Sequence, residues 1–373
     1  MHLLMTQALD LAAKGQTLTS PNPSVGCVIA NSKGLVFGQG HTQRAGGPHA
    51  EVMALRDAAD QGHAVRGATA YVTLEPCSHH GRTPPCCDAL VEAGIGTVMV
   101  AQQDPNPLVA GRGIARLRAA GIDVTVLPPE DPIAQAAREL NIGFFSRMIR
   151  KSPWVRMKIA ASLDGHTALL NGQSQWITSE AARADGHAWR ARACAVLTGI
   201  GTVLQDQPRL DVRLVATPRQ PHLVVVDSRL EAPLDAPLFI ADRPVFIYAA
   251  VPNQLKQQVL EARGATVIYL PDDKSGARGK VDLNAMLLDL ARRDINELHV
   301  EAGHKLNGSL VRAGLVDEFV VYLAPKLLGQ GSGMADFGPL AALSEAVELV
   351  FMSTERLGPD LRIVARVKGR DQF

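Results

Sequence analysis

The chain has 373 residues, more than one hydrophobic core usually spans, so two domains are expected. A hydrophobic fraction of 46% is typical of a folded globular protein and excludes a disordered chain. The 38 Lys and Arg residues balance the 37 Asp and Glu residues, which argues against a broad basic surface for nucleic acid or an anionic membrane. A local pocket for a small anion stays compatible with this balance.

The five cysteines do not indicate a disulfide framework, because their number is odd and the N-terminus lacks the features of a signal peptide. No stretch reaches the roughly 18–20 apolar residues that cross a bilayer. We therefore expect a cytoplasmic protein. Cys27 and Cys194 are expected to be core residues, whereas Cys77, Cys86 and Cys87 cluster as a metal site requires.

The first part of the chain alternates segments of strand and helix character. Strands are predicted over 25–30, 35–40, 70–74, 97–101 and 123–127. Helices are predicted over 2–14, 49–60, 86–93, 112–120 and 132–146. This alternation predicts an α/β domain with a mixed sheet that is covered on both faces.

The basic segment 147–153 is interpreted as a linker between domains at 1–147 and 148–373. A second α/β pattern follows it. Its clearest strands are predicted over 154–161, 195–198, 223–227, 245–249, 266–270, 298–301 and 318–323. Its helices are predicted over 179–192, 252–263, 281–293 and 306–313.

The strongest motif combines His49-Ala-Glu51 with Pro-Cys77 and Pro-Cys86, the signature of zinc deaminases. Eight residues rather than two separate its cysteines. Two thiolates and one imidazole leave a coordination position open on zinc, and the metal lowers the pKa of a water there towards ~7. Glu51 would take that proton and pass it to the ring nitrogen and the leaving ammonia.

The spacing of this motif restricts where its helices begin. His49 and Glu51 would point about 200° apart within one regular helix. We therefore expect His49 just before a helix and Glu51 in its first turn. The prolines at 84–85 favour a helix that starts near Cys86, whose thiolate the free amides of the first turn would stabilise.

Other interpretations of these residues stay open. The zinc could be structural, with Cys87 as a fourth ligand, although adjacent cysteines rarely reach one ion together. His79 and His80 are rival ligands, but we favour them as substrate contacts. The cysteines could also pack without any metal.

Several motifs together resemble the bifunctional deaminase/reductase family of riboflavin biosynthesis. They lie at 21–26, 49–51, 73–86, 103–107 and 111–113. The long insert between the two cysteines separates this family from cytidine and tRNA deaminases. The resemblance covers the whole chain. It implies a cytidine-deaminase-like three-layer α/β/α domain followed by a dihydrofolate-reductase-like α/β domain.

For the first domain, the resemblance implies hydrolysis of the 2-amino group of a diaminopyrimidinone that carries a ribosylamino 5′-phosphate. It implies Asn22, His41, His79 and Arg82 as substrate contacts. An amide can read a pyrimidine edge, and Arg82 with the histidines can hold a phosphate. From the residues alone, it stays open that Asn22 is a turn residue and His41 an ordinary surface histidine.

In the second half, the residues alone say less. Gly199-x-Gly201 follows a strand but lacks the third glycine of a dinucleotide fingerprint. At 301–309 a strand, a glycine loop and a helix follow one another, and the free amides of such a helix suit a phosphate. An ordinary strand–helix turn stays an alternative there.

The segments 158–165, 174–178 and 201–206 resemble the family's reductase domain, which uses NADPH to reduce a ribosylamino side chain to ribitylamino. Lys158 and Asp206 are the candidate catalytic groups. The implied cofactor contacts are Ala160, Trp176, Thr202, Asp206, Ser228, Gly303, His304, Lys305, Leu306, Asn307, Gly308 and Ser309. The implied substrate contacts are Ser174, Arg190, Leu210, Arg213 and Glu301.

Four of these residues carry a further expectation. Arg190 and Arg213 suit a two-pronged contact to the 5′-phosphate. His304 stands where the family often has a small residue or proline, which affects the shape of the cofactor loop. Trp176 could instead fill a core.

The resemblance also implies a homo-oligomer with small phosphorylated pyrimidine substrates and no nucleic-acid or membrane partner. Two other hypotheses stay open. In one, the chain is only a deaminase and its second half serves assembly. In the other, it is a nucleotide- or RNA-binding protein with a structural zinc.

Overall fold

The computed structural model describes residues 2–78, 84–272 and 279–373. The chain forms two compact units, one that ends at Arg150 and one that begins at Lys151. Each unit has its own sheet. The domain boundary that we placed after residue 147 stays a prediction.

The first unit contains a mixed five-stranded sheet. Its strands are β1 (Gly26–Ala30), β2 (Val36–His41), β3 (Thr69–Val72), β4 (Thr97–Val100) and β5 (Asp123–Val126). The spatial order is β2-β1-β3-β4-β5, with β1 antiparallel to both its neighbours and β3, β4 and β5 parallel. All five residues of β1 are buried, as expected for a central strand covered on both faces.

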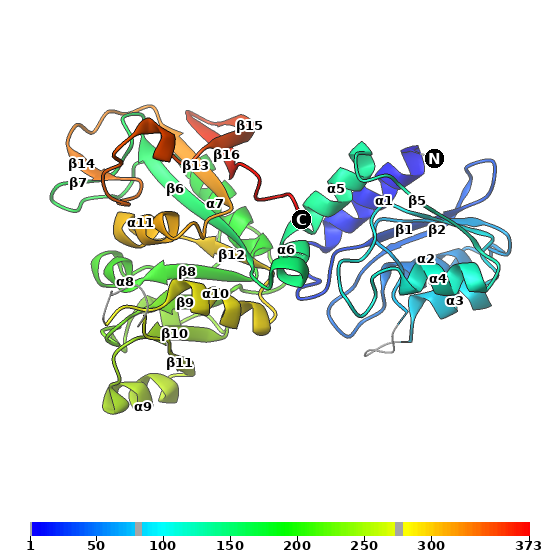
Figure 1. Ribbon diagram of the computed structural model, residues 1–373, viewed down its shortest axis with the longest axis horizontal. Helices are drawn as coiled ribbons and strands as arrows, with labels where there is room; N and C mark the ends of the chain where they lie inside the picture. Colours follow the sequence, from blue (N-terminus) through cyan, green and yellow to red (C-terminus); the bar gives the residue numbers. More distant parts are fainter. Residues whose placement is uncertain (1, 79–83, 273–278) are drawn as a thin grey trace. The chain divides into compact units, whose positions relative to one another are not determined.

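Helices cover both faces of this sheet. The helices described in this unit are α1 (His2–Gly15), α2 (Ala50–Asp60), α3 (Cys86–Glu92), α4 (Arg112–Ala119), α5 (Pro132–Leu140) and α6 (Ile142–Arg150). Figure 1 shows α1 and α5 on one face and α2, α3 and α4 on the other. The predicted three-layer α/β/α domain is therefore confirmed.

The predicted single helix over 132–146 is wrong, because the chain breaks it at Asn141. The Asn141 side chain accepts a hydrogen bond from the Ser24 N–H at 2.7 Å and donates one to the Ser24 carbonyl at 2.9 Å. These bonds to a distant segment hold Asn141 outside regular helix geometry, between α5 and α6. The linker over 147–153 is also wrong in its first half, because α6 continues to Arg150 and buries Phe144 and Phe145.

The second unit is built on a nine-stranded sheet of order β11-β10-β9-β8-β12-β6-β13-β16-β15. Its strands are β6 (Trp154–Ser162), β8 (Ala195–Gly199), β9 (His222–Val226), β10 (Val245–Ala249), β11 (Ala265–Tyr269), β12 (Glu297–Val300), β13 (Glu318–Ala324), β15 (Leu349–Leu357) and β16 (Asp360–Val367). The strands from β11 to β13 are parallel, and β16 and β15 add an antiparallel edge. A separate small sheet pairs β7 (His166–Leu169) with β14 (Gly331–Gly333).

Helices again lie on both faces of the large sheet. They are α7 (Glu180–Arg192), α8 (Ile200–Asp206), α9 (Gln254–Ala262), α10 (Leu283–Arg292) and α11 (His304–Arg312), with short 3-10 turns at Pro237–Phe239 and Leu343–Glu345. Neighbouring strand residues point to opposite cores: Leu197 packs in the cluster that contains Leu290 and Leu310, and Val196 packs in the one that contains Leu260. Thus α10 and α11 cover one face and α9 lies on the other. The reductase-type α/β fold that we predicted is confirmed.

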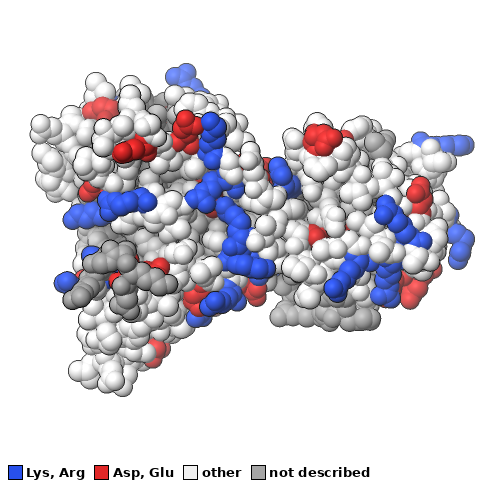
Figure 2. Space-filling model, viewed as in Figure 1, with Lys and Arg blue, Asp and Glu red and all other residues white. Residues whose placement is uncertain are grey.

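Among the described residues, no helix is long and apolar enough to cross a bilayer. Figure 2 shows Lys and Arg side chains together with Asp and Glu side chains on the visible face, between wide uncharged areas.

Candidate active sites

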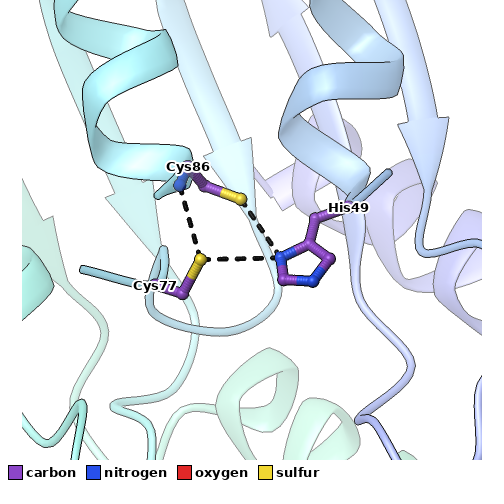
Figure 3. A group of neighbouring side chains, drawn as sticks. All are labelled: His49, Cys77 and Cys86. Atoms are coloured by element: carbon purple, nitrogen blue, oxygen red, sulfur yellow. Dashed lines mark hydrogen bonds between the residues drawn. The ribbon is translucent and has the colours of Figure 1, made fainter. Parts of the chain in front are cut away.

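Three potential metal ligands converge in the first unit (Figure 3). His49 immediately precedes α2, Cys86 is the first residue of α3, and Cys77 follows β3. The Nδ1 atom of His49 lies 3.5 Å from the Sγ atom of Cys77 and 3.2 Å from that of Cys86. The Cys86 backbone N–H also donates to the Cys77 sulfur at 3.4 Å, as expected at a helix start.

This geometry fits zinc. Zn–N and Zn–S bonds of about 2.0 and 2.3 Å in a tetrahedron place nitrogen and sulfur roughly 3.6 Å apart. All three ligand atoms lie within 4.8 Å of one another. The hydrogen bond from Cys86 lowers the pKa of the Cys77 thiol and so favours the thiolate, the form that binds metal.

Glu51 lies beside these ligands in the first turn of α2 and is only 3% exposed. Burial first, and then the charge on the Cys77 sulfur, raise the pKa of the Glu51 carboxyl to about 7. Its side chain also hydrogen-bonds that of Cys86. A carboxyl group with such a pKa can both accept and release a proton near neutrality.

Cys87 is oriented away from this cluster. Its Sγ donates to the carbonyl oxygens of Pro76 at 3.2 Å and Gly113 at 3.5 Å. Within the described part of the chain, the cluster consists of His49, Cys77 and Cys86 alone. These three ligands leave the fourth coordination position of a tetrahedral ion open.

Glu75 supports the loop that follows β4, a role we did not predict. Its buried carboxylate accepts the backbone N–H groups of Asp104, Gly111 and Ile114 at 2.9–3.2 Å. The signal for this role is a charged residue inside an otherwise apolar run just before Cys77, because a buried carboxylate requires donors.

Of the predicted deaminase substrate contacts, Asn22 and His41 lie within the described residues. Asn22 follows a turn in which its N–H donates to the Thr19 carbonyl, and His41 ends β2 opposite Gly26. His79 and Arg82 lie outside the described residues. Contact of these side chains with substrate stays a prediction.

The second unit contains a cavity of about 910 Å³, large enough for a cofactor and a substrate side by side. It opens at the C-terminal ends of β6 and β12, where ligands bind in open α/β sheets. The predicted residues that line it are Lys158, Ala160, Ser174, Trp176, Arg190, Thr202, Asp206, Leu210, Arg213, Glu301, Gly303, His304 and Asn307.

A buried charge cluster lies in the wall of this cavity. The Arg190 guanidinium holds the Glu301 carboxylate through Nε and Nη2, and Lys158 Nζ lies 3.7 Å from the same carboxylate. Burial raises the pKa of Glu301, but the charges of Arg190 and Lys158 outweigh it and hold that pKa well below its usual range. Burial lowers the pKa of Lys158. Arg190, which we predicted to bind the 5′-phosphate, therefore binds the Glu301 carboxylate in this structure.

Asp206 and Trp176 lie at other parts of the same cavity. Burial raises the pKa of the Asp206 carboxyl, which also hydrogen-bonds Ser174. Trp176 is 61% exposed, so it is not a core residue. The Arg183 guanidinium stacks over its ring at 4.5 Å, which holds the ring in place at the mouth of the cavity.

Five predicted cofactor contacts do not line the cavity: Ser228, Lys305, Leu306, Gly308 and Ser309. Leu306 packs against the core that contains Leu310. Gly308 has a steric role, because a Cβ there would lie 1.8 Å from the Asp336 carbonyl oxygen. Contact of these residues with the cofactor stays a prediction.

Sequence reasoning missed His187, which lines the cavity three residues before Arg190 on α7. The signal was available, since residues three apart on a predicted helix share one face. It also missed Asp211, whose carboxylate pairs with the Arg209 and Arg213 side chains.

Comparisons with known proteins give a family match for each unit. Residues 1–102 match the profile described as the cytidine and deoxycytidylate deaminase zinc-binding region, and residues 153–363 match the RibD C-terminal domain. The riboflavin biosynthesis protein RibD of Escherichia coli K12 is 44% identical over 366 residues, which cover 96% of each chain. That of Aquifex aeolicus is 41% identical over 359 residues, again 96% of each chain.

Two solved structures cover 98% of this chain and 98% of their own. One is Acinetobacter baumannii RibD, with a TM-score of 0.86 and 38% identity. The other, from Thermotoga maritima, has a TM-score of 0.84 and 31% identity and is described as a diaminohydroxyphosphoribosylaminopyrimidine deaminase/5-amino-6-(5-phosphoribosylamino)uracil reductase.

A zinc-deaminase unit and a reductase unit in one chain define a bifunctional enzyme, a deaminase/reductase of riboflavin biosynthesis. The chain belongs to the RibD family of riboflavin biosynthesis proteins. Its deaminase unit takes zinc and its reductase unit takes NADPH. The resemblance drawn from the motifs is thereby confirmed.

Proposed function

We propose that the first unit hydrolyses the 2-amino group of 2,5-diamino-6-ribosylamino-4(3H)-pyrimidinone 5′-phosphate. The second unit then reduces the ribosyl side chain of the product, 5-amino-6-(5-phosphoribosylamino)uracil, to ribityl. The named reactions of the Thermotoga relative support these substrates. The observation that carries the proposal is the three-ligand cluster with Glu51 buried beside it.

In the deaminase unit, His49, Cys77 and Cys86 hold zinc. When bound, the metal supplies a water of lowered pKa. Glu51 would take one proton from the attacking water for the ring nitrogen and a second from the resulting hydroxyl for the amine that leaves. One water is consumed and one ammonia is released.

In the reductase unit, the glycine loop before α11 lines the cavity, and the N-cap residue Gly303 has no side chain to cap the first turn of that helix. Its free amides suit the phosphates of NADPH. Bound NADPH supplies the hydride for C1′ of the opened sugar. Lys158 and Asp206 are the candidate proton donors, and Glu301 accepts hydrogen bonds from ribose hydroxyls.

The order of the two reactions provides the test. With the diaminopyrimidinone alone, the protein is expected to release ammonia without NADPH. With NADPH present, its oxidation is expected only after deamination, and at once with the deaminated substrate. NADPH oxidation before any ammonia release would contradict this order, and none at all would favour a deaminase with a degenerate second half.

We also propose that the protein works in the cytoplasm as a homo-oligomer. The family resemblance supports this expectation. Sedimentation of the purified chain tests the oligomeric state, and a monomer at micromolar concentration would contradict the proposed homo-oligomer.

A further inference from the structure

The loop between α8 and β9 carries two of the predicted substrate contacts, Leu210 and Arg213. Leu210 has a φ of 52°, in the left-handed region that non-glycine residues seldom adopt. Such backbone persists only where its surroundings fix it.

Side chains bind the backbone of every residue from 209 to 213, and all of them except Gln220 come from outside this loop. Arg243 donates to the carbonyls of Arg209 and Leu210, and Arg190 donates to that of Asp211 at 2.9 Å. The Gln220 side chain bonds both backbone groups of Val212, at 2.7 and 2.9 Å.

His187 provides the last of these contacts. Its Nδ1 atom accepts the backbone N–H of Arg213 at 3.1 Å, and its ring is only 4% exposed within α7. The Arg213 Nη1 donates to Asp211 Oδ1, within the same loop, at 2.8 Å. His187 therefore anchors to α7 the backbone from which the Arg213 guanidinium projects.

We propose that His187 is a positioning residue of the reductase site, which directs the Arg213 guanidinium to the substrate phosphate by accepting the Arg213 backbone N–H. This inference rests on the proposed function and on the predicted contact of Arg213 with the substrate phosphate. An acceptor at Nδ1 requires that this nitrogen carry no proton. Burial, and then the cations of Arg190 and Arg213, lower the pKa of His187 to about 4, so the ring is neutral at neutral pH.

Two variants separate this role from mere packing. In His187→Asn the amide oxygen takes nearly the position of Nδ1 and can accept the same N–H, whereas His187→Leu fills a similar volume without an acceptor. The measurements are reductase KM and kcat with the deaminated substrate, and ammonia release as an internal control from the other unit. Fluorescence of the three Trp residues, which all lie in the second unit, monitors its folding.

His187→Leu is expected to raise the reductase KM about tenfold with little change in kcat, because the lost interaction contributes to binding throughout the reaction. His187→Asn is expected to stay within about twofold of the wild type. An unchanged KM in His187→Leu, or an equal loss in both variants, would overturn the proposal. If His187→Leu fails to fold, His187→Asn decides alone, and a tenfold rise in its KM is the overturning result.

Arg213→Ala distinguishes this inference from the proposed function. With Arg213 truncated, His187→Leu is expected to add no further rise in KM, because the two residues act as one unit. A wild-type KM in Arg213→Ala would remove the phosphate contact itself. A raised KM in Arg213→Ala together with a normal KM in His187→Leu would overturn only the role of His187.

Discussion

The Nδ1 atom of His49 lies 3.2 Å from the Sγ atom of Cys86, although 37 residues separate them in the chain. Their proximity follows from the packing of α2 beside α3 on one face of the first sheet, since His49 precedes α2 and Cys86 begins α3. The N-termini of two helices therefore place an imidazole and a thiol next to each other. Cys77, after β3, completes the set.

The neighbouring cysteines Cys86 and Cys87 provide a matched pair of variants. Cys86→Ser is expected to lower bound zinc well below one equivalent and to abolish ammonia release, because it removes one of three ligands. Cys87→Ser is expected to retain zinc and most activity, since the Cys87 thiol bonds two backbone carbonyls instead. Metal analysis of both proteins checks this. Equal zinc loss in the two would make Cys87 a ligand and the site structural.

Glu51→Gln tests the proton transfer apart from metal binding. The variant is expected to retain its zinc but to release ammonia about 10²–10⁴ times more slowly, the usual contribution of a positioned acid/base. NADPH oxidation with the deaminated substrate serves as the control, and it should not change. Full ammonia release by a zinc-loaded Glu51→Gln protein would show that another group moves the proton.

Arg190→Ala is expected to raise the reductase KM about ten- to hundredfold, because charge-assisted hydrogen bonds contribute about 1.5–3 kcal/mol each. The structure adds a second cause, since the Glu301 carboxylate loses its two-pronged partner. Arg190→Lys should not restore the KM, because an ammonium cannot span both oxygens. Steady-state kinetics with the deaminated substrate measures this, and an unchanged KM would remove Arg190 from the substrate site.

The pKa of the buried Glu318 carboxyl predicts how the stability of the second unit changes at acidic pH. Burial raises the pKa of Glu318, but Arg156 and Arg366 outweigh it and hold the pKa at about 2, below its usual 4.5. Between these values the unfolded chain binds more protons than the folded one, so the free energy of unfolding falls as the pH drops from 4.5 to 2. Glu318→Gln should flatten this dependence and lower the stability at pH 7 by about 3 kcal/mol.

Urea unfolding followed by Trp fluorescence checks this prediction in the second unit. Glu348→Gln is the control, because the Glu348–Lys368 pair has both side chains 70% exposed and should contribute nothing measurable. The same acid dependence in Glu318→Gln as in the wild type would show that other carboxyl groups govern it.

Local patterns predicted the parts of the fold that depend on neighbouring residues. The prolines before Cys86 fix the start of α3, and the fully buried run 195–199 is apolar enough to indicate a central strand. The motif residues around His49 and Cys77 likewise indicated the metal site, because zinc chemistry requires those residue types.

Long-range contacts decided what local patterns did not predict. The break at Asn141 depends on Ser24, 117 residues away. The edge strand β15 is mostly exposed on both faces, so it lacks the alternation that marks a half-buried strand. The Arg190–Glu301 pair joins residues 111 positions apart, and no spacing rule indicates that these two side chains meet.

One chain holds two sites with separate chemistry, a zinc deaminase and an NADPH reductase. Zinc content, ammonia release and NADPH oxidation test this separation when all three are measured on one purified sample, before and after zinc removal by a chelator. We predict about one zinc per chain and both activities, with only ammonia release lost on chelation. Loss of both activities together, or ammonia release that survives complete zinc removal, would contradict the account.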